Sequence, residues 1–249
     1  MTTDSISAGF TLTQGTLLGG RVTYRQPSAG YRTGIEPVLL AASVAARPGE
    51  RVVEGGTGAG AGVLCLAARL PGVIAIGVER DAALAQLAQA NIEANGFALA
   101  RVDAGDIRDL PAEPRFDHAI ANPPWHEPLG TASPTPMREA AKRATPGLLE
   151  AWTGRLGRSL RQGGTLTLLV PATLTAQALD AVTKAGCGGA TLLPLWPRPG
   201  QEARLLLLRA TKTGRGPCRI LPGLVLHEGD GFSAEARAIL WEGAALTWR

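Results

Sequence analysis

The chain has 249 residues, of which 45% are hydrophobic, 18% are charged and 4% are aromatic, and its formal net charge is +4. This apolar share argues against a mostly disordered chain, and the length suits one α/β domain of ordinary size. No stretch approaches the ~20 apolar residues that cross a bilayer, and the amino terminus lacks a basic start before an apolar run. We therefore expect neither a membrane span nor a secretory signal.

Three cysteines, Cys65, Cys187 and Cys218, lie far apart. Their odd number and wide spacing give poor support for a disulfide framework or a metal site, so we expect a cytoplasmic protein without a metal. Residues 1–137 carry 10 basic and 13 acidic residues, and residues 138–249 carry 15 basic and 8 acidic ones. The basic second half fits a polyanion-binding surface and, equally well, ordinary solvated charge.

The first twenty residues have little pattern and predict a flexible lead-in or a short hairpin. A strand over 20–26 and a helix over 36–46 follow, with Pro37 in the first turn of the helix, where a missing N–H is harmless. From residue 51 onward, strand patterns alternate with helical ones. We expect strands over 51–54, 73–78, 101–104, 117–121, 165–170, 191–196 and 203–210, and helices over 63–70, 81–95, 148–160 and 175–185.

The β-α-β alternation favours an α/β fold, with a parallel sheet covered by helices on both faces. Asp81 and Gly96 give the helix over 81–95 a favoured N-cap and a favoured stop. Residues 127–146 form a loop rich in Pro, Thr and Ala, long enough to indicate function or mobility. We predict one domain over 1–249, made of a lead-in and helix over 1–48, a core over 49–211, and an extra strand (219–226) and helix (233–240) within 212–249.

A glycine-rich loop, Glu54-Gly-Gly-Thr-Gly-Ala-Gly60, follows the first core strand. Its spacing lacks the last glycine of the dinucleotide fingerprint, and no Gly-Lys-Ser/Thr follows to make a phosphate loop. A carboxylate at the start of the loop would repel a pyrophosphate, and it suits a hydrogen-bond donor or a ligand with cationic groups. The alternative is a plain glycine-rich turn between core elements.

Two further acidic residues follow the next strands. Glu79 ends the second strand, 23 positions beyond Gly56, where a carboxylate commonly holds ribose hydroxyls. Asp106 follows the third strand, where an acid can accept from an adenine amino group. Each alone is more often a helix cap or a solvated residue. Three acids at successive strand ends, together with the glycine loop, indicate a ligand site.

The tetrad Asn122-Pro123-Pro124-Trp125 follows the fourth strand directly. The two prolines have no N–H and fix the chain, so that carbonyl oxygens can point at a ligand. The Asn122 side-chain oxygen and a proline carbonyl can both accept from one planar NH₂ group, and the Trp125 ring offers a face on which a flat base stacks, worth about 1–3 kcal/mol. The alternative is a rigid strand exit with a core tryptophan.

These motifs together resemble the class I methyltransferases that use S-adenosylmethionine, and the tetrad is similar to the N/D-P-P-Y/F/W motif of enzymes that methylate planar nitrogens. The stretch QPSAGYRTGIEPVLL, from Gln26 to Leu40, resembles the opening of the bacterial tRNA adenine-N6-methyltransferases that act next to the anticodon of a valine tRNA. LPLWPR, which ends at Arg198, and LVLHEGDG, which starts at Leu224, resemble the same group. The resemblance covers about residues 20–240 and implies a doubly wound, mostly parallel, seven-stranded Rossmann-like methyltransferase sheet with a short N-terminal extension.

The chain departs from the family pattern at two positions. Gly55 stands where a bulky apolar residue is usual, and we expect a looser loop there. Trp125 replaces the commoner Tyr or Phe, which preserves stacking and changes the width of the pocket.

The resemblance implies transfer of a methyl group from a sulfonium to an amine, with positioning as the main contribution of the protein. The cofactor is S-adenosylmethionine, held around the glycine loop, and the tetrad holds the target amine. The expected cofactor-binding residues are Glu54, Gly56, Gly58, Gly60, Glu79, Asp106, Arg32 and Thr33. The expected catalytic residues are Asn122, Pro123, Pro124 and Trp125.

A base paired in a duplex cannot reach such a pocket, so the target must be flipped or unpaired, as in an RNA loop. We therefore expect an RNA partner, preferably a tRNA, and no membrane partner, while the oligomeric state stays open. Solvated surface is the alternative for each basic residue. The candidate RNA contacts are Arg138, Lys142, Arg143, Lys212 and Arg215.

Two other functions remain open. A glutamine-amide methyltransferase of translation factors shares Asn-Pro-Pro-aromatic because an amide also carries a planar NH₂ group, but the stretch from Gln26 to Leu40 favours RNA. A nucleotide-binding or RNA-binding protein without catalysis is the third function, which the intact acids at three strand ends disfavour.

Overall fold

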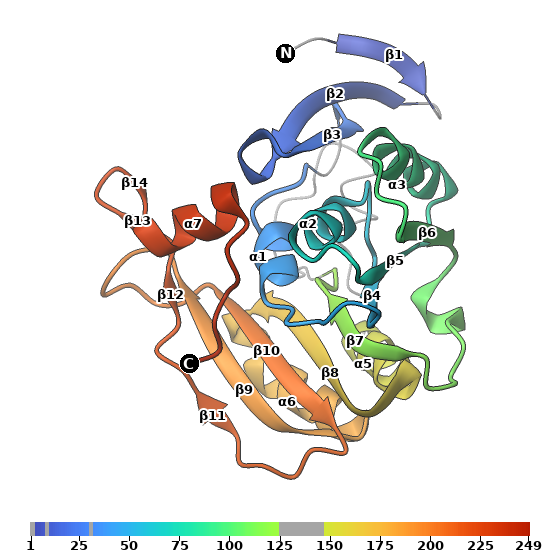
Figure 1. Ribbon diagram of the computed structural model, residues 1–249. Helices are drawn as coiled ribbons and strands as arrows, with labels where there is room; N and C mark the ends of the chain where they lie inside the picture. The colour runs from blue at the N-terminus through green and yellow to red at the C-terminus, as the bar shows by residue number, and fades with distance from the viewer. Residues whose placement is uncertain (1–2, 8–9, 30–31, 125–146) are drawn as a thin grey trace.

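The computed structural model describes residues 3–7, 10–29, 32–124 and 147–249. A mixed sheet runs through the molecule, with helices on both faces and a small antiparallel sheet above it (Figure 1). Its long strands lie in the order β6-β5-β4-β7-β8-β10-β9. In chain order they are β4 (Arg51–Gly55), β5 (Ile74–Glu79), β6 (Ala100–Ala104), β7 (Phe116–Ala121), β8 (Leu160–Pro171), β9 (Cys187–Trp196) and β10 (Leu205–Lys212).

The pairs from β6 to β8 are all parallel, and β10 is antiparallel to both of its neighbours. From β4 the chain builds outward to β5 and β6, then returns to place β7 and β8 on the other side of β4. The ends of β4 and β7 therefore form the topological switch point, where doubly wound sheets bind ligands. The predicted doubly wound, mostly parallel sheet is confirmed.

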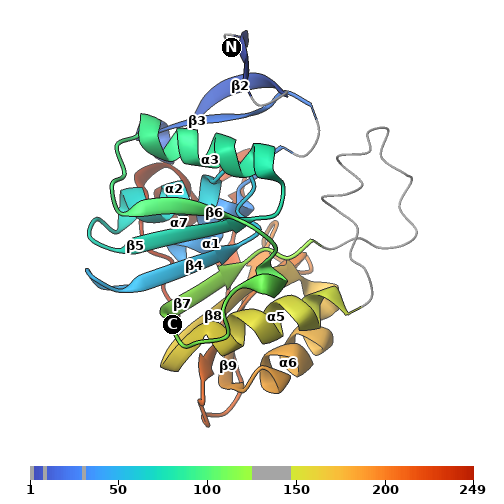
Figure 2. The same cartoon turned by 90° about the vertical axis from the view of Figure 1, so that its right-hand side faces the viewer.

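Neighbouring residues on a strand face opposite sides of the sheet, and two apolar cores result. Val52 and Val53 of β4, for example, belong to different cores. Figure 2 shows the helices of the two cores on opposite sides of the strands. The first core contains α1 (Glu36–Ala42), α2 (Ala61–Arg69), α3 (Ala82–Ala94) and α7 (Ala234–Glu242), and the second contains α5 (Leu148–Ser159) and α6 (Thr175–Lys184). Short 3-10 turns occupy η1 (Leu18–Gly20), η2 (Ile107–Asp109) and η3 (Ala172–Leu174).

Helix α3 has the two ends that the sequence predicts. The Asp81 carboxylate accepts hydrogen bonds from the amides of Ala83 and Leu84 at 2.9 and 3.0 Å, and Gly96, at φ +70°, follows the last turn. Both end signals are local, so the sequence contains them completely.

Helix α1 is shorter than predicted, because it ends at Ala42 and not at Ala46. The carbonyls of Ala42 and Ser43 accept hydrogen bonds from Leu246 N and Trp248 Nε1 of the C-terminal segment, each at 2.9 Å. These carbonyls would otherwise accept from the next helical turn. A segment from the far end of the sequence therefore takes the place of that turn.

Residues 3–27 contain a three-stranded antiparallel sheet where the sequence predicted a lead-in or a short hairpin before the strand over 20–26. The strands pair in the order β1 (Thr3–Ser7), β2 (Phe10–Leu17), β3 (Val22–Pro27). The side chains of Leu12, Val22 and Tyr24 are buried in the first core. Burial against the helices, which the local pattern does not contain, stabilises this sheet.

The predicted extra strand over 219–226 is two short strands, β11 (Arg219–Ile220) and β12 (Leu224–Val225), both parallel to β9. Pro222 has no N–H to donate, Gly223 takes φ +88°, and Trp196 Nε1 donates to Pro222 O at 2.8 Å. A hairpin of β13 (His227–Glu228) and β14 (Gly231–Phe232) then leads to α7. The predicted helix over 233–240 is confirmed, with Ser233 as its N-cap.

Arg21 and Arg69 join both terminal segments to the core. Each guanidinium donates to two backbone carbonyls, and the acceptors lie at the C-terminal ends of α1, α2 and α7, where helix dipoles favour a cation. Arg69 bonds to Ala41 O (2.6 Å) and Gly243 O (3.1 Å), and Arg21 bonds to Ala68 O (3.2 Å) and Glu242 O (2.8 Å). We call these two residues the arginine pair.

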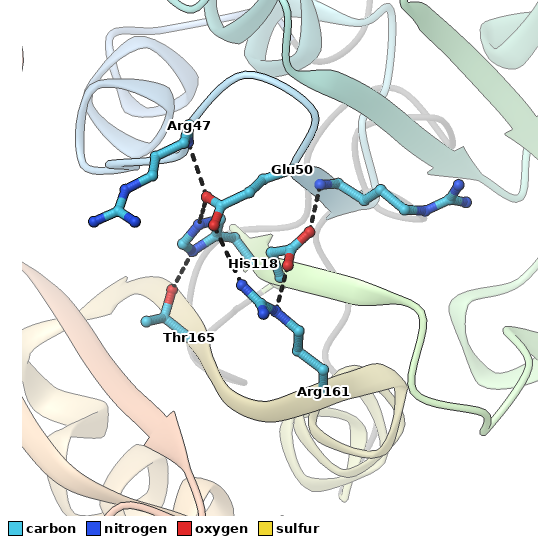
Figure 3. Close-up of polar contacts among 7 residues, drawn as sticks. Arg47, Glu50, His118, Arg161 and Thr165 are labelled. Carbon is cyan, nitrogen blue, oxygen red and sulfur yellow. Dashed lines mark hydrogen bonds and ion pairs between the residues drawn. The ribbon is translucent and has the colours of Figure 1, made fainter.

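A polar cluster joins the starts of β4, β7 and β8, at the amino end of the sheet (Figure 3). His118 of β7 contacts Glu50 Oε2 through Nε2 at 3.1 Å and Thr165 Oγ1 of β8 through Nδ1 at 2.7 Å. Glu50 Oε2 also accepts from the Arg47 amide at 2.8 Å. That amide, followed by His118, holds the pKa of Glu50 below its ordinary value.

Arg161 links this cluster to a second carboxylate (Figure 3). It donates to Glu50 Oε1 at 3.2 Å and forms an ion pair with Asp117. Asp117 accepts from the Arg51 amide at 2.6 Å. The cluster therefore ties three neighbouring strands together at the end opposite the switch point.

Candidate active site

Four predicted site residues lie at the carboxyl end of the sheet, beside the switch point. Glu54 lies near the end of β4, Glu79 ends β5, Asp106 follows β6, and Asn122 follows β7. Parallel strands all finish at the same end of a sheet, so residues distant in sequence are brought together there.

The glycine loop turns over the end of β5. Gly56 (φ +69°) donates to Val78 O at 2.8 Å, and Gly58 (φ +58°) donates to Glu79 Oε2 at 2.9 Å. Both φ values lie in the left-handed region that favours glycine. A Cβ at Gly58 would meet no atom within 4 Å, so the backbone is open to a ligand there.

Gly55 does not leave the loop loose. A Cβ at this position would lie 3.3 Å from the Ile107 side chain and 3.6 Å from Leu156 Cδ1. Ile107 and Leu156, both buried, therefore fill the space where a bulky residue is usual in the family. At the other end of the loop, a Cβ at Gly60 would lie 3.1 Å from Ala88 Cβ, so α3 approaches the backbone closely.

Glu54 lies beneath the loop and is 5% exposed. Its Oε2 accepts from Thr57 Oγ1 at 2.6 Å and from the Val63 amide at 2.9 Å. A Cβ at Gly62 would lie 2.0 Å from Glu54 Oε1, so a side chain at this position would displace the Glu54 carboxyl. Burial raises the pKa of Glu54 to about 7, although the two hydrogen bonds favour its charged form.

The two other acids have different partners. Glu79 accepts from the amides of Gly58 and Asp81, each at 2.9 Å, and this fixes its carboxylate against the loop. Asp106 accepts from Arg108, from its amide at 2.8 Å and from its guanidinium Nη2 at 2.7 Å. The Arg108 guanidinium holds the pKa of Asp106 below its ordinary value, so this acid is charged at neutral pH.

Asn122 has an unusual environment. Its side-chain oxygen, Oδ1, is buried and has no hydrogen-bond partner among the residues that the structure describes. A buried acceptor without a partner costs free energy, so such atoms are rare unless a ligand completes them. Pro123 and Pro124 follow and offer no N–H donor that could satisfy it locally. Trp125, the last residue of the tetrad, lies outside the described residues.

Thr33 is held by the strand that precedes it. Its amide donates to Gln26 Oε1 at 3.0 Å, and its hydroxyl lies 2.7 Å from Tyr24 Oη. Arg32 beside it is exposed. The role of Arg32 and Thr33 in cofactor binding stays a prediction.

Two of the five candidate RNA contacts, Lys212 and Arg215, lie within the described residues. Lys212 ends β10, which runs antiparallel, so it lies at the amino end of the sheet, away from the glycine loop. Its Nζ donates to Ala185 O, at the end of α6, at 2.8 Å, and Arg215 follows in the same turn region. The direction of β10 therefore separates these two residues from the site. Three others lie outside the described residues: Arg138, Lys142 and Arg143.

Sequence reasoning missed Trp152. A Cβ at Gly56 would lie 2.6 Å from the Trp152 indole, so this ring of α5 packs directly on the glycine loop. The two residues are far apart in the chain, and no spacing pattern links them. Only the packing of α5 over the carboxyl end of the sheet brings them into contact.

Within the described residues, no group of three or more His, Cys, Asp or Glu side chains could hold a metal ion. No helix in that part of the chain is both long and apolar enough to cross a membrane.

Residues 36–179, more than half of the chain, match the family model of the methyltransferase small domain. A tRNA1(Val) (adenine(37)-N6)-methyltransferase of Cronobacter sakazakii is 27% identical over 205 residues, 81% of this chain and 78% of that protein. An enzyme of the same name from Porphyromonas gingivalis is 32% identical over 156 residues, 59% of this chain and 61% of that protein.

Solved structures show the same fold. A predicted O-methyltransferase of Agrobacterium tumefaciens superposes with a TM-score of 0.71 at 26% identity, covering 86% of this chain and 98% of that one. The 16S rRNA N2 G1207 methyltransferase of T. thermophilus, in complex with AdoMet and guanosine, has a TM-score of 0.56 at 25% identity, covering 81% of this chain and 50% of that one.

Proposed function

The chain belongs to the methyltransferase small domain family and is an S-adenosylmethionine-dependent methyltransferase, and from this premise we propose that it methylates N6 of an adenine in tRNA. The proposal covers the substrate and the role of each residue. It rests on the geometry at the end of β7 and on the names of the curated relatives.

The observation that carries the proposal is the unpartnered Oδ1 of Asn122. An exocyclic amine has two N–H donors in one plane, and a buried amide oxygen beside a proline carbonyl can accept both. With the two hydrogens held in this way, the nitrogen lone pair is directed out of that plane, where a methyl group can be accepted. Pro123 and Pro124 keep this geometry rigid, and Trp125 supplies the stacking face.

The residues around the glycine loop fit the cofactor. The open backbone at Gly58 admits its methionine part, with Gly56 and Gly60 shaping the turn. When bound, the cofactor supplies a methyl carbon on a positively charged sulfur, whose departure as a neutral thioether needs little acid catalysis. The work of the protein is then positioning, which can contribute several kcal/mol to the barrier.

Each acid has a proposed part in that positioning. Glu79 accepts from the ribose hydroxyls, and Asp106 accepts from the adenine amino group of the cofactor. Glu54 interacts with the cofactor amino group, directly or through water, and Arg32 and Thr33 bind on the side of the N-terminal sheet. The Gly58 amide donates to Glu79 at 2.9 Å, which holds this carboxylate beside the open backbone of the loop and supports a ligand that contacts both.

The target base must be unpaired or flipped to reach Asn122, which suits an anticodon loop. Arg138, Lys142 and Arg143 remain proposed phosphate contacts, and binding through them should weaken steeply with salt. Lys212 and Arg215 lie at the amino end of the sheet, so as phosphate contacts they would meet a part of the RNA away from the target base. A tRNA substrate agrees with the cytoplasmic location that the sequence predicts.

Transfer of a tritiated methyl group to bulk tRNA, compared with transfer to ribosomal and release-factor protein, tests the substrate class. We expect labelled tRNA and N6-methyladenosine in its nucleoside digest. Labelled protein with unlabelled tRNA would favour the glutamine-amide alternative, and cofactor binding without transfer would favour the non-catalytic one.

Asn122→Ala tests the catalytic role. We expect turnover to fall by about a hundredfold, since the amine loses an acceptor that orients it, with cofactor affinity unchanged in calorimetry. Asn122→Asp keeps an acceptor oxygen and should retain part of the activity. Full turnover in Asn122→Ala would contradict the role.

A further inference from the structure

Two asparagines of α3 pair with the backbone of β3. Asn91 accepts from Arg25 N at 3.1 Å and donates to Arg25 O at 2.8 Å. Asn95 accepts from Thr23 N at 2.9 Å and donates to Thr23 O at 2.7 Å. Residues four apart share a helix face, and alternate residues of a strand present their backbone to the same side. The two amides therefore occupy the place of a neighbouring strand and close this edge of the N-terminal sheet.

Asn91 makes one contact that Asn95 does not make. Asn91 Nδ2 also donates to Ala59 O, in the glycine loop, at 3.0 Å, whereas the second bond of Asn95 Nδ2 goes to Asn91 O of its own helix. Asn91 is 2% exposed, so water does not replace these bonds easily. Ala88, one turn earlier on α3, lies against Gly60 of the same loop.

The strand that Asn91 holds continues to the predicted cofactor residues of the N-terminal segment. Tyr24 and Gln26 of β3 bond to the hydroxyl and the amide of Thr33. Hydrogen bonds from Asn91 to the glycine loop and to Arg25, the backbone of β3, and hydrogen bonds that join Tyr24 and Gln26 to Thr33 therefore form a continuous path. The two segments proposed to meet the cofactor are separated in sequence, and Asn91 links them through β3.

We propose that Asn91 is a positioning residue for S-adenosylmethionine binding, which fixes the glycine loop relative to the N-terminal sheet; this rests on the proposed location of the cofactor site. A shorter side chain leaves the buried Ala59 O and the backbone of Arg25 without the bonds that Asn91 makes. The loop then shifts or opens to find water, and the backbone at Gly58 loses its place opposite Glu79. Asn91 itself need not touch the cofactor.

Asn91→Ala and Asn95→Ala form a matched pair of variants. Both remove two bonds to β3, but only Asn91→Ala removes the bond to the glycine loop. Amide hydrogen exchange in the unliganded protein should speed up at Arg25 in Asn91→Ala and at Thr23 in Asn95→Ala, and at Gly56 and Gly58 in Asn91→Ala alone. The dissociation constant for S-adenosylhomocysteine should rise about tenfold in Asn91→Ala and less than twofold in Asn95→Ala.

Equal weakening of cofactor binding in both variants would overturn the proposal, because the effect would then belong to the sheet as a whole. Unchanged exchange at Gly56 and Gly58 in Asn91→Ala would overturn it as well. Where Asn91→Ala fails to fold, Asn91→Ser, which keeps one hydrogen-bonding group, should show the same effects at smaller size. The proposed site itself fails separately if Glu79→Ala binds S-adenosylhomocysteine with wild-type affinity, and the exchange data then still decide the role of Asn91.

Discussion

Among single residues, Glu54 should make the stability of the protein depend on pH, because its pKa is raised. Its carboxyl is buried beneath the glycine loop, and its pKa is raised from 4.5 to about 7. Between these two values the folded protein holds a proton that the unfolded chain has lost. The associated stability is fully present below about pH 4.5 and is lost as the pH rises to about 7, and it amounts to about 3 kcal/mol.

Replacement of Glu54 by Gln should remove this dependence. Urea unfolding of Glu54→Gln and wild type, measured from pH 4.5 to 8, should show a difference in unfolding free energy that moves in favour of the variant by about 3 kcal/mol over that range. The amide cannot lose a proton, so only wild type is destabilised by a buried charge as the pH rises. A difference that stays constant with pH would contradict the raised pKa.

Cofactor binding should also release a proton at neutral pH if Glu54 lies near the cofactor's positive charges, since they favour the carboxylate. Calorimetry in two buffers of different ionisation enthalpy measures that proton. Glu54→Gln should bind without releasing it, which separates this residue from other titrating groups.

Among elements, strands β4, β7 and β8 are held at their starts by the polar cluster of Figure 3. Glu50 receives bonds from Arg47, His118 and Arg161, and its pKa is lowered by them. Its stabilising contribution is therefore present above about pH 4.5 and is lost as the pH falls through the lowered pKa. The contribution of Glu50 to stability therefore rises with pH, whereas that of Glu54 falls with pH.

Glu50→Gln should cost about 2 kcal/mol of unfolding free energy at pH 7, because it weakens several charge-assisted bonds at once. The difference in unfolding free energy between the variant and wild type should become smaller toward pH 3, where protonation makes the wild-type carboxyl neutral like the amide. Glu113→Gln is the control, because its ion pair with Arg115 is exposed and should change stability by less than about 0.5 kcal/mol. A Glu50→Gln variant as stable as Glu113→Gln would refute the role of the cluster.

Local signals explain which elements could be predicted. Helix α3 has its cap and its stop in its own sequence, and the core strands have their own apolar runs. The end of α1 depends on Leu246 and Trp248, and the N-terminal sheet depends on Asn91 and Asn95 of a distant helix. These interactions exist only after the chain has folded, so no local pattern contains them.

The candidate site also contains residues that the sequence predicts and residues that only the folded structure shows. Strand-end residues could be predicted, because parallel topology sends each strand end to one place, and Glu54, Glu79 and Asn122 all lie there. Trp152 and Asn91 reach the loop from helices whose position the sequence does not specify. The distance of Lys212 from the loop could not be predicted, because the composition of β10 does not give its antiparallel direction.

For the whole molecule, the arginine pair connects the terminal segments to the core. Arg69 is partly buried and bonds to Ala41 and Gly243, at the ends of α1 and α7. Burial lowers the pKa of its guanidinium, which nevertheless stays charged at neutral pH. The predicted single domain over 1–249 therefore implies that the C-terminal extension unfolds together with the sheet.

Arg69→Met keeps most of the side-chain volume and removes the donors. We expect a loss of about 3 kcal/mol, since two backbone carbonyls lose charged partners, together with faster amide exchange in residues 243–249. The exposed Arg158 provides a control, and Arg158→Met should leave both quantities unchanged. Two separate thermal transitions in wild type would contradict the single domain.

The three cysteines differ in their exposure. Cys65 and Cys187 are buried, whereas Cys218 is exposed and precedes Arg219 of β11, which pairs with Thr191 in the middle of β9. A maleimide tether would therefore attach at one point, on the β11 edge of the sheet, which β9, β10, β8 and β7 separate from β4 and the glycine loop. Protein anchored to a sensor chip in this way would have its attachment point on the far edge of the sheet from the glycine loop, which leaves the loop side accessible to injected nucleic acid.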